Sequence, residues 1–580
     1  MNLIQKMIIQ FIMNIVDFIT EKNDSLYQRL TPGKFFPLLF ICLIFIGLTP
    51  LLIPGIPYSG YHDLTYHLSR LHAMDVNLSV GEFPSVINHE LKNGYGYGTG
   101  LFYPNVFLYP AVFVMKCGFS IITAYKLLIA VTVCAAALSA YYCAWKISQN
   151  HFCAFSAALL HTWSSYFAVN IFTRAAVGEY SMFVFIPWIL LGLYEIILGD
   201  PRHFLYLSFG FAGLLCSHRL SPLLAGVICF IFCLLNFVRF LREPRRILYL
   251  ALSTIPAILV SAACIVPMLE QLRHFTFYIE HDQNVYTPRH VMPFLKLFLE
   301  IPNSKIVPWI PSGIGIMLTI VAMQRFRLPA ARQSSIGQFG DMTLIAGLAC
   351  LLMSTEMPSW EGLFKPLDFI QFPWRFFAPA TAFLAFGGGQ ALSELVNGSP
   401  QKTRHWFWMV VFGTAFSWFV NVGYDYAVNI YRHQMMKDYH QTETDERHYL
   451  MNDLNENVFP RGDIVTSSRP INATLARPRI NVLEMTFDGN SSDNEVELPV
   501  IPYYGYVAKM TLADGSCRFL KLGRGPNKLL SVGIPSTVSS GTVAIRYRST
   551  FLQRLSYCIS VISTLSLVIL FLCKKRRRHS

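Results

Sequence analysis

Residues 61–72, YHDLTYHLSRLH, place an acid, histidines and an arginine directly after a hydrophobic run. If the stretch is helical, Asp63, His67 and Arg70 stand at positions i, i+4 and i+7 and share one face. Such an acid could take a proton from a substrate hydroxyl or bind a metal ion, while the cation binds an anionic substrate. The pattern fits a salt-bridged amphipathic helix at the lipid headgroups equally well, so the residues alone favour neither interpretation.

Three more short segments place charged residues at the ends of hydrophobic runs. FTRAAVGEY carries Arg174 and Glu179, CSHRLSP carries His218 and Arg219, and FPWRF carries Arg375. Taken alone, the segments with Arg174 and with His218 favour an ordinary interfacial loop or polar cap over a functional site. Arg375 fits a phosphate-binding residue and a snorkelling side chain equally well.

The segment NGYGYGTGLFYP, residues 93–104, alternates glycine with Tyr95 and Tyr97. Tyrosine rings on a flexible backbone could form a platform on which a sugar ring stacks. The glycines equally permit a tight loop against the membrane, and the sequence leaves both alternatives open.

The composition indicates the scaffold that must position these residues. Of the 580 residues, 53% are hydrophobic and 14% are charged, and the mean hydropathy is +0.41. Several apolar runs reach the roughly 20 residues that cross a bilayer, so we predict a polytopic α-helical membrane protein. The net charge of +13 comes from short basic loops and the tail CKKRRRHS, and therefore does not predict a nucleic-acid partner.

We predict about twelve transmembrane helices, at residues 35–56, 120–146, 152–172, 180–198, 203–217, 220–241, 247–269, 309–324, 341–355, 374–394, 405–422 and 551–573. The basic loops then share one side of the membrane, which the positive-inside rule assigns to the cytoplasm together with both termini. The apolar run 105–117 is too short to span and contains Pro110, so we predict a helix packed at the outer face. This topology places outside the residues Asp63, Arg174, Glu179, Arg219 and Arg375.

The prediction divides the chain into four parts. Residues 1–34 form a cytoplasmic or interfacial amphipathic N-terminus, and residues 35–423 form a transmembrane domain with a first outer loop at 57–119. Residues 424–549 form an extracytoplasmic β-rich domain, and residues 550–580 form the last transmembrane helix and a basic cytoplasmic tail. Alternating segments separated by turn residues predict that the β-rich domain is a small antiparallel β-sandwich.

The segments HDLTYHLSRL, GEFP and NGYGYGTGLFYPNVFLYPAVFV together carry a family resemblance. They resemble the signature of bacterial membrane proteins labelled pyruvoyl-tetrahydropterin-synthase-related, which lack the fold of that enzyme. RAAVGEY, SHRLSPLL and IQFPWRF extend the resemblance, which covers roughly residues 35–573. These proteins are similar to the YfhO-like group and fall in the GT-C superfamily of multi-span glycosyltransferases.

The resemblance implies a glycosyltransferase that moves a sugar from a polyprenyl-phosphate donor to an envelope glycan or lipid. The reaction would invert the anomeric centre at the outer face of the bacterial inner membrane. Asp63 takes the place of the acid in the first outer loop, which acts as base or metal ligand, and Glu179 that of the acid in the next. Because His62 and not a second acid precedes Asp63, the sequence argues against a two-carboxylate metal site, and Mg²⁺ or Mn²⁺ bound by Asp63 stays an open alternative. The residues assigned to the donor phosphate and the substrate are Arg70, Arg174, Arg219, Arg375, His67, His218, Tyr95 and Tyr97.

Two other classes of function remain as alternatives. A lipid or glycan transporter or flippase usually carries charges at mid-membrane and internal repeats, whereas here the charges cluster at one surface. A non-catalytic envelope assembly protein would use the β-rich domain for binding.

Overall fold

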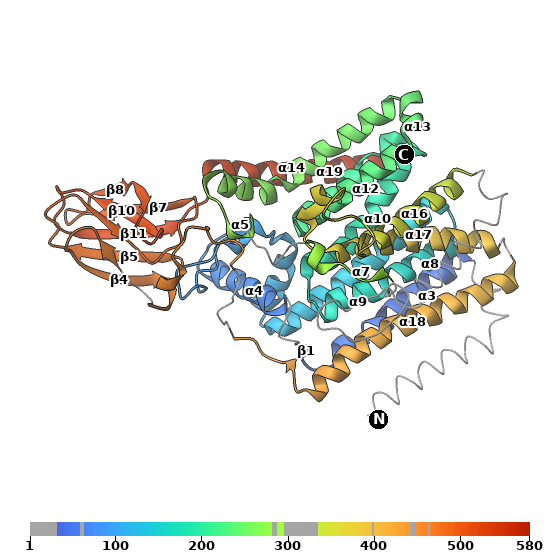
Figure 1. Cartoon of the computed structure of the whole chain (residues 1–580), viewed down its shortest axis with the longest axis horizontal. Coiled ribbons are helices and arrows are strands. Elements are labelled where there is room, and N and C mark those ends of the chain that lie inside the picture. The colour runs from blue at the N-terminus through green and yellow to red at the C-terminus, as the bar shows by residue number, and fades with distance from the viewer. Residues whose placement is uncertain are drawn as a thin grey trace.

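The computed structural model describes residues 32–58, 63–280, 287–294, 334–396, 399–440, 447–461 and 465–579. A body of long helices is joined at one end to a β-rich region, and the last helix returns along the body (Figure 1). The main helices of the body are α3 (Pro32–Gly47), α7 (Ile121–Ser148), α8 (His151–Thr162), α9 (Ser165–Phe172), α10 (Val177–Ile197), α11 (Leu205–Ser217), α12 (Ser221–Leu235), α14 (Arg245–His274), α16 (Ser335–Met353), α17 (Phe377–Val396), α18 (Pro400–Tyr431) and α19 (Phe551–His579).

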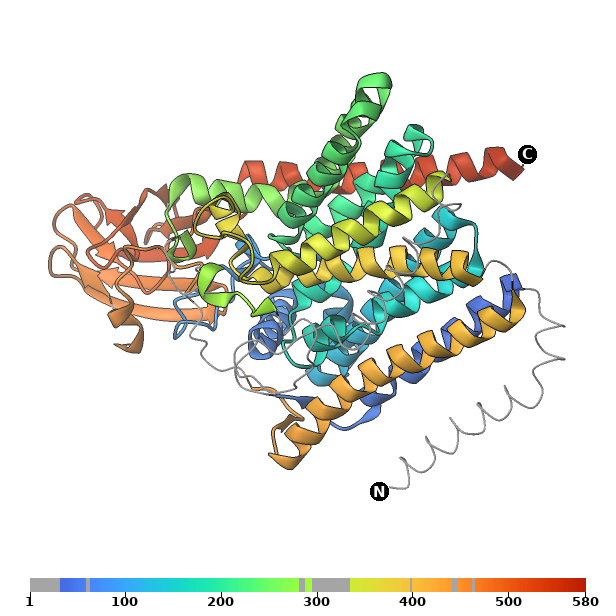
Figure 2. The ribbon, with the colours of Figure 1, turned by 45° about the vertical axis from the view of Figure 1, so that its right-hand side comes forward.

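Seven helices among the described residues are long and apolar enough to cross a membrane, so the chain is a multi-pass membrane protein. They comprise Lys34–Leu52, Ile121–Ser148, Val177–Ile197, Arg245–His274, Ser335–Met353, Pro400–Tyr431 and Phe551–Leu570. Helices also stand at the other predicted spans, except that the span at 309–324 and most of the N-terminal segment 1–34 lie outside the described residues. α3 and α18 lie side by side along one face of the body (Figure 2).

The structure differs from the predicted spans in two places. The span at 152–172 is interrupted, because Ser164 caps a new helix by accepting a hydrogen bond from the amide of Phe167 at 3.4 Å. The spans at 203–217 and 220–241 contain α11 and α12, with 13 and 15 residues, which is short of the length that crosses a bilayer. Hydropathy alone does not show where a capping residue or a polar turn ends a helix.

The first outer loop contains three short helices. They are α4 (Leu64–Ser79), α5 (Thr99–Phe102) and α6 (Tyr109–Lys116). α6 occupies the apolar run 105–117 and packs against α4 and α7. With eight residues it is too short to span a bilayer, as the sequence predicted.

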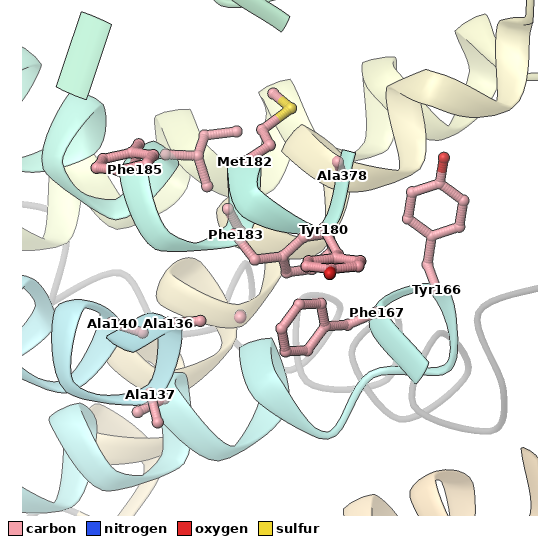
Figure 3. Close-up of a cluster of buried hydrophobic side chains, with 14 of the residues drawn as sticks. Ala136, Ala137, Ala140, Tyr166, Phe167, Tyr180, Met182, Phe183, Phe185 and Ala378 are labelled. Atoms are coloured by element: carbon pink, nitrogen blue, oxygen red, sulfur yellow. The ribbon is translucent and has the colours of Figure 1, made fainter. Parts of the chain in front are cut away.

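Helix α10 lies at the centre of the body and carries Glu179 in its first turn. Pro187 in its middle has no amide to bind the carbonyl of Phe183, four residues earlier. The ring Nε2 of His161 on α8 donates to that carbonyl at 2.9 Å instead. Phe183 also stacks on Phe167 of α9, with ring centroids 4.4 Å apart (Figure 3). These contacts fix the first half of α10 against α8 and α9.

The other end of α10 is held by arginines from α13 (Phe237–Arg242) and from the start of α14. Arg246 donates through Nη1 to the carbonyls of Ile196 at 2.8 Å and Gly199 at 3.1 Å. Arg239 donates to the carbonyl of Ile197 at 3.3 Å. Cations at a helix C-terminus stabilise its free carbonyls. The basic loops and Glu179 therefore stand at opposite ends of α10.

The β-rich region is a sandwich of two antiparallel sheets. One sheet has the order β3-β6-β10-β9, and the other β4-β5-β11-β7-β8. Side chains from both sheets, such as Met485, Val496, Met510 and Val532, share one buried core. The strands are β3 (Thr466–Ser467), β4 (Asn472–Arg479), β5 (Val482–Asp488), β6 (Asn494–Glu497), β7 (Tyr506–Thr511), β8 (Cys517–Leu520), β9 (Leu522–Arg524), β10 (Leu530–Ile534) and β11 (Gly541–Tyr547).

The sandwich is attached to the end of α14 by two neighbouring side chains. Gln271 exchanges two hydrogen bonds with the backbone of Tyr504, at 2.7 and 2.9 Å. Glu270 accepts from Thr550 at 2.9 Å and from Gln553 at 2.7 Å, at the point where β11 leads into α19. A two-residue pairing of β1 (Ile56–Pro57) with β2 (Met435–Met436) joins the ends of α3 and α18.

Candidate functional site

Asp63 stands at the N-cap of α4, exposed to solvent. Its backbone amide donates to the carbonyl of Arg174 at 3.1 Å, which places α4 against the turn between α9 and α10. The Asp63 charge is among the causes that raise the pKa of Arg174. The structure therefore brings the start of α4 and the turn between α9 and α10 together.

His67 and Arg70 follow Asp63 on α4 but are almost fully buried. Arg70 donates through Nη2 to the carbonyl of Pro104 at 2.6 Å and to Oδ1 of Asn105 at 2.7 Å. Its Nη1 lies 3.0 Å from Nδ1 of His67. Since a guanidinium has no acceptor, Nδ1 of His67 accepts and the ring proton is on Nε2. Burial and the Arg70 charge hold the pKa of His67 well below its usual range.

Nη2 of Arg70 therefore holds the loop at residues 103–105, while Nε of Arg70 is buried without a hydrogen-bond partner among the described residues. The sequence assigned Arg70 to the donor phosphate. In the structure its guanidinium binds the backbone and side chains of the loop at residues 103–105. The spacing of His67 and Arg70 predicted that they share a helix face. It does not reveal that the loop at Tyr103, 33 residues after Arg70, covers that face.

Glu179 is the acceptor at the centre of a buried ion cluster. Its Oε2 lies 2.5 Å from Nη1 of Arg174, and its Oε1 lies 3.0 Å both from Nη2 of Arg174 and from Nε of Arg375. The hydroxyl of Tyr166 donates to Oε2 at 2.9 Å. Burial opposes the charge of Arg174, but the Glu179 carboxylate outweighs it and raises the pKa of Arg174. Each carboxylate oxygen thus accepts two hydrogen bonds, and Glu179 orients two guanidinium groups.

A small pocket lies beside this cluster, between α10, α12 and the start of α17. The cavity volume is about 10 Å³, which is room for about one water molecule. Its polar lining is Glu179, His218, Ser221 and Arg375. Its apolar lining is Met182, Leu220, Leu224, Ile370 and Ala378. A charged rim on apolar walls suits an amphiphilic ligand with an anionic head.

His218 lines this pocket as a neutral imidazole. Burial, followed by the nearby charge of Arg375, lowers the pKa of His218 to about 3. Its Nδ1 lies 2.8 Å from the hydroxyl of Ser221. Arg375 therefore brings the positive charge to the pocket, and it is held there by Glu179 and by bonds from Nη1 to Ile370 and Gln371.

Arg219 points to the other side of the same turn. Its Nη2 donates to the carbonyl of Leu101 at 3.3 Å, and its guanidinium lies 5.9 Å from the ring centre of Phe102. Its Nε and Nη1 are buried and have no hydrogen-bond partner among the described residues. Burial lowers the pKa of Arg219 to about 10, so it is charged at neutral pH. A buried cation with spare donors is costly unless an anion joins it.

Tyr95 and Tyr97 are buried and do not form an open sugar platform. The Tyr95 hydroxyl donates to the carbonyl of Val458 at 3.2 Å, and that of Tyr97 accepts from the amide of Tyr449 at 3.1 Å. They belong to a core between the first outer loop and residues 449–459. Of the two alternatives for this glycine-rich segment, the structure favours the tight loop.

Tyr103 is a site residue that the sequence did not single out. Its ring lies 4.2 Å from the guanidinium of Arg70 and 5.9 Å from the ring of His218. A Cβ added at Gly178 would collide with the Tyr103 hydroxyl and with Cδ2 of His218. Burial raises the pKa of Tyr103, so its hydroxyl stays protonated. Its position directly after the glycine-rich segment was the available signal.

Asp425 is a second residue that sequence reasoning passed over. It is buried near the end of α18 and accepts a hydrogen bond from the hydroxyl of Thr173, next to Arg174. The sequence placed the β-rich domain from residue 424, whereas α18 continues to Tyr431. An acid within an apolar run was the signal that this helix is longer.

The donor set does not fit a metal ion. Within the described residues, no three His, Cys, Asp or Glu side chains are grouped to hold one. Glu179 is surrounded by cations, and His62, beside Asp63, lies outside the described residues. No step is therefore derived through a metal.

No family model matches the chain, and no curated protein matches it. Solved structures do match, among them the crystal structure of ArnT from Cupriavidus metallidurans bound to undecaprenyl phosphate. The TM-score is 0.42 and the sequence identity 13%, over 64% of this chain and 63% of that one, which is less than two thirds of its length. A TM-score at this level does not show a shared fold, and the function is inferred below from the site itself.

Proposed function

We propose that this protein is a GT-C-type glycosyltransferase of the bacterial inner membrane. It transfers a sugar from a polyprenyl-phosphate donor to an envelope glycan or lipid on the extracytoplasmic side, with inversion. In this proposal both termini are cytoplasmic, and the pocket beside Glu179 opens toward the outer side.

The observation that carries the proposal is the meeting of four outer segments that are far apart in the sequence. Asp63 from the first loop contacts the turn of Arg174 through its backbone, and Glu179 holds both Arg174 and Arg375. His218 from a further turn lines the same pocket as Glu179 and Arg375. The charges are gathered at one end of the helices, which favours surface chemistry over passage through the membrane.

The proposed reaction is a single displacement. The acceptor hydroxyl attacks the anomeric carbon from the face opposite the phosphate, the bond between that carbon and the phosphate oxygen breaks, and the hydroxyl proton passes to Asp63. Asp63 suits this role because it is the exposed carboxylate of the site. Arg375 offsets the charge that develops on the leaving phosphate.

The acid in the second loop acts differently from the first. Because all hydrogen bonds to Glu179 come from cations and a tyrosine, it serves as a positioning residue that directs Arg375 into the pocket. The apolar wall of the pocket, with Met182, Leu220 and Leu224, would contact the first prenyl units. Arg219 is a further candidate for a substrate anion, because its Nε and Nη1 have no partner in the part of the chain that the structure describes.

Envelope glycans compared by mass spectrometry test the proposal. Cells that produce Asp63→Asn should lack the sugar that wild-type cells add, while the variant protein is inserted normally. Asp75→Asn is the matched control, because Asp75 is on the same helix and pairs with Lys116 at 2.9 Å, away from the pocket. Normal glycosylation by Asp63→Asn would refute the proposal, and lipid flipping by reconstituted wild-type protein without any transfer would replace it with a flippase.

A further inference from the structure

The outward side of the five-stranded sheet carries an unusual set of side chains. Along β7 and β11 the residues alternate, and Ala508, Met510, Val543 and Ile545 face the sandwich core. Lys509 and Arg546 stand on the opposite side of these strands and are exposed, while Ala544, between Val543 and Ile545, is half-buried. This outward side of β4, β5, β11, β7 and β8 is called the glycan face below.

A row of threonines crosses the glycan face. The strand register pairs Thr474 with Thr486, Thr486 with Thr542, and Thr542 with Thr511. Neighbouring strands lie about 4.8 Å apart, so the four hydroxyls extend over about 14 Å. The Oγ1 atoms of Thr486 and Thr542 lie 3.4 Å from each other. The row is flat and presents hydroxyl groups at regular intervals.

The neighbouring row contains an aromatic ring and positive charge. Lys509 stands opposite Phe519 of the edge strand β8, and Phe519 is 68% exposed. Arg546 lies two residues further along β11, opposite Val507. Within the described residues neither base forms a salt bridge, although Glu484 is on the same face. On the half of the face formed by β11, β7 and β8, the outward charges are therefore all positive.

We propose that the glycan face binds a stretch of anionic polysaccharide, the acceptor of the transfer. Hydroxyl rows exchange hydrogen bonds with sugar hydroxyls, and the Phe519 ring can pack against a sugar ring. Lys509 and Arg546 complement carboxylate or phosphate groups along the polymer. An open sheet surface of this length suits an extended chain. The acceptor role rests on the proposed function, whereas the binding itself does not.

The test uses the full-length protein in phosphatidylcholine nanodiscs, with alginate as an anionic probe and dextran as a neutral one. Wild-type protein should bind alginate in a salt-dependent way and bind dextran much more weakly. The double variant Lys509→Ala/Arg546→Ala should bind alginate about tenfold more weakly, the size expected for two exposed charge contacts. Phe519→Ala should weaken binding without changing its salt dependence.

The matched control is Arg469→Ala/Lys437→Ala, which removes the same charge from exposed positions outside the glycan face. An equal loss in this control, equal binding of dextran, or no binding of alginate by the wild type would each overturn the inference. If the protein captures phosphatidylglycerol vesicles but does not bind alginate, the face binds lipid, and the inference is overturned as well. Asp63→Asn should bind alginate normally, so loss of transfer in that variant and loss of polymer binding count against different proposals.

Discussion

Arg375 reaches the pocket because Glu179 holds it, with Nε of the arginine 3.0 Å from Oε1 of the carboxylate. The two residues are 196 positions apart and come from different helices. Glu179 binds Arg174 on its other side, so a single buried carboxylate determines where two cations point.

Glu179→Gln should lose both stability and binding of polyprenyl phosphate. Removing one partner of a buried ion pair costs about 3–5 kcal/mol, because the remaining charges are left without compensation. Adding Arg174→Met should restore part of the thermal stability in detergent but not the lipid binding, which is measured by native mass spectrometry. A stable Glu179→Gln protein that binds the lipid and fails only in transfer would show instead that Glu179 is the reacting base.

Gly178→Ala should impair the site directly. The new Cβ would lie 2.7 Å from Cδ2 of His218 and would also meet the hydroxyl of Tyr103, so overpacking should cost about 1–3 kcal/mol. Gly226→Ala on α12 is the control, because a Cβ there meets nothing within 4 Å. Thermal unfolding and glycan analysis of both variants check this, and equal behaviour of the two would contradict the packing found around Gly178.

His161→Leu should be rescued by Pro187→Ala. The first change leaves the buried carbonyl of Phe183 without a donor, at a cost of about 1–3 kcal/mol. The second supplies an amide at position 187 that can bind this carbonyl within the helix. In a double-mutant cycle the two changes together should cost less than their sum. Strict additivity would mean that the carbonyl is satisfied in another way.

Low pH should destabilise the protein in part through His218. The pKa of His218 is lowered to about 3 by burial and by Arg375, whereas an unfolded histidine titrates near 6.5. Below about pH 6.5 the unfolded chain binds a proton that the folded chain does not. The contribution of His218 to the free energy of unfolding is therefore fully present above pH 6.5. It falls by up to about 1.4 kcal/mol per pH unit as the pH drops toward 3.

His218→Gln should make this pH dependence shallower, as measured by thermal unfolding between pH 4 and 7. His405→Gln changes an exposed histidine on α18 and should leave the slope unchanged. An unaltered slope in His218→Gln would mean that the imidazole is not buried beside Arg375 in solution.

The sequence predicted the helices better than their ends. Apolar runs identify segments that avoid water, so helices lie at the predicted positions that the structure describes. Single polar residues mark the places where the helices differ from the prediction, with Ser164 before the break and Asp425 inside the continuation of α18. Hydropathy averaged over a window of residues conceals such single positions. In the sandwich, β5, β6, β7, β10 and β11 lie at the alternating segments INVLEMTF, EVELPV, YVAKMTLA, LLSVGI and TVAIRYR, on which the prediction rested, whereas β4 (NATLARPR) lies outside them.

For the site, the sequence indicated which residues share an end of the bundle but not which of them pair. Arg70 binds the carbonyl of Pro104, whereas Arg375 binds both the carbonyl of Ile370 and the carboxylate of Glu179. Tyr103 stands in the segment NGYGYGTGLFYP, which the sequence marked as a whole without indicating His218 as a neighbour of this ring. The partner of each side chain depends on contacts between segments that are far apart in the chain. The spacing and composition of a single sequence do not indicate these contacts.

The attachment of α14 has a consequence for biosynthesis. Glu270 meets Thr550, which is 280 residues later in the chain, and Gln271 meets Tyr504, 233 residues later. At about 5–20 residues per second, the ribosome needs about 15–60 s to deliver Thr550 after Glu270 has been made. During that interval the end of α14 has a carboxylate and an amide without their final partners. The helix can take its mature position only when translation is almost finished, so a nascent chain arrested before residue 504 should expose this end of α14 to chaperones and proteases.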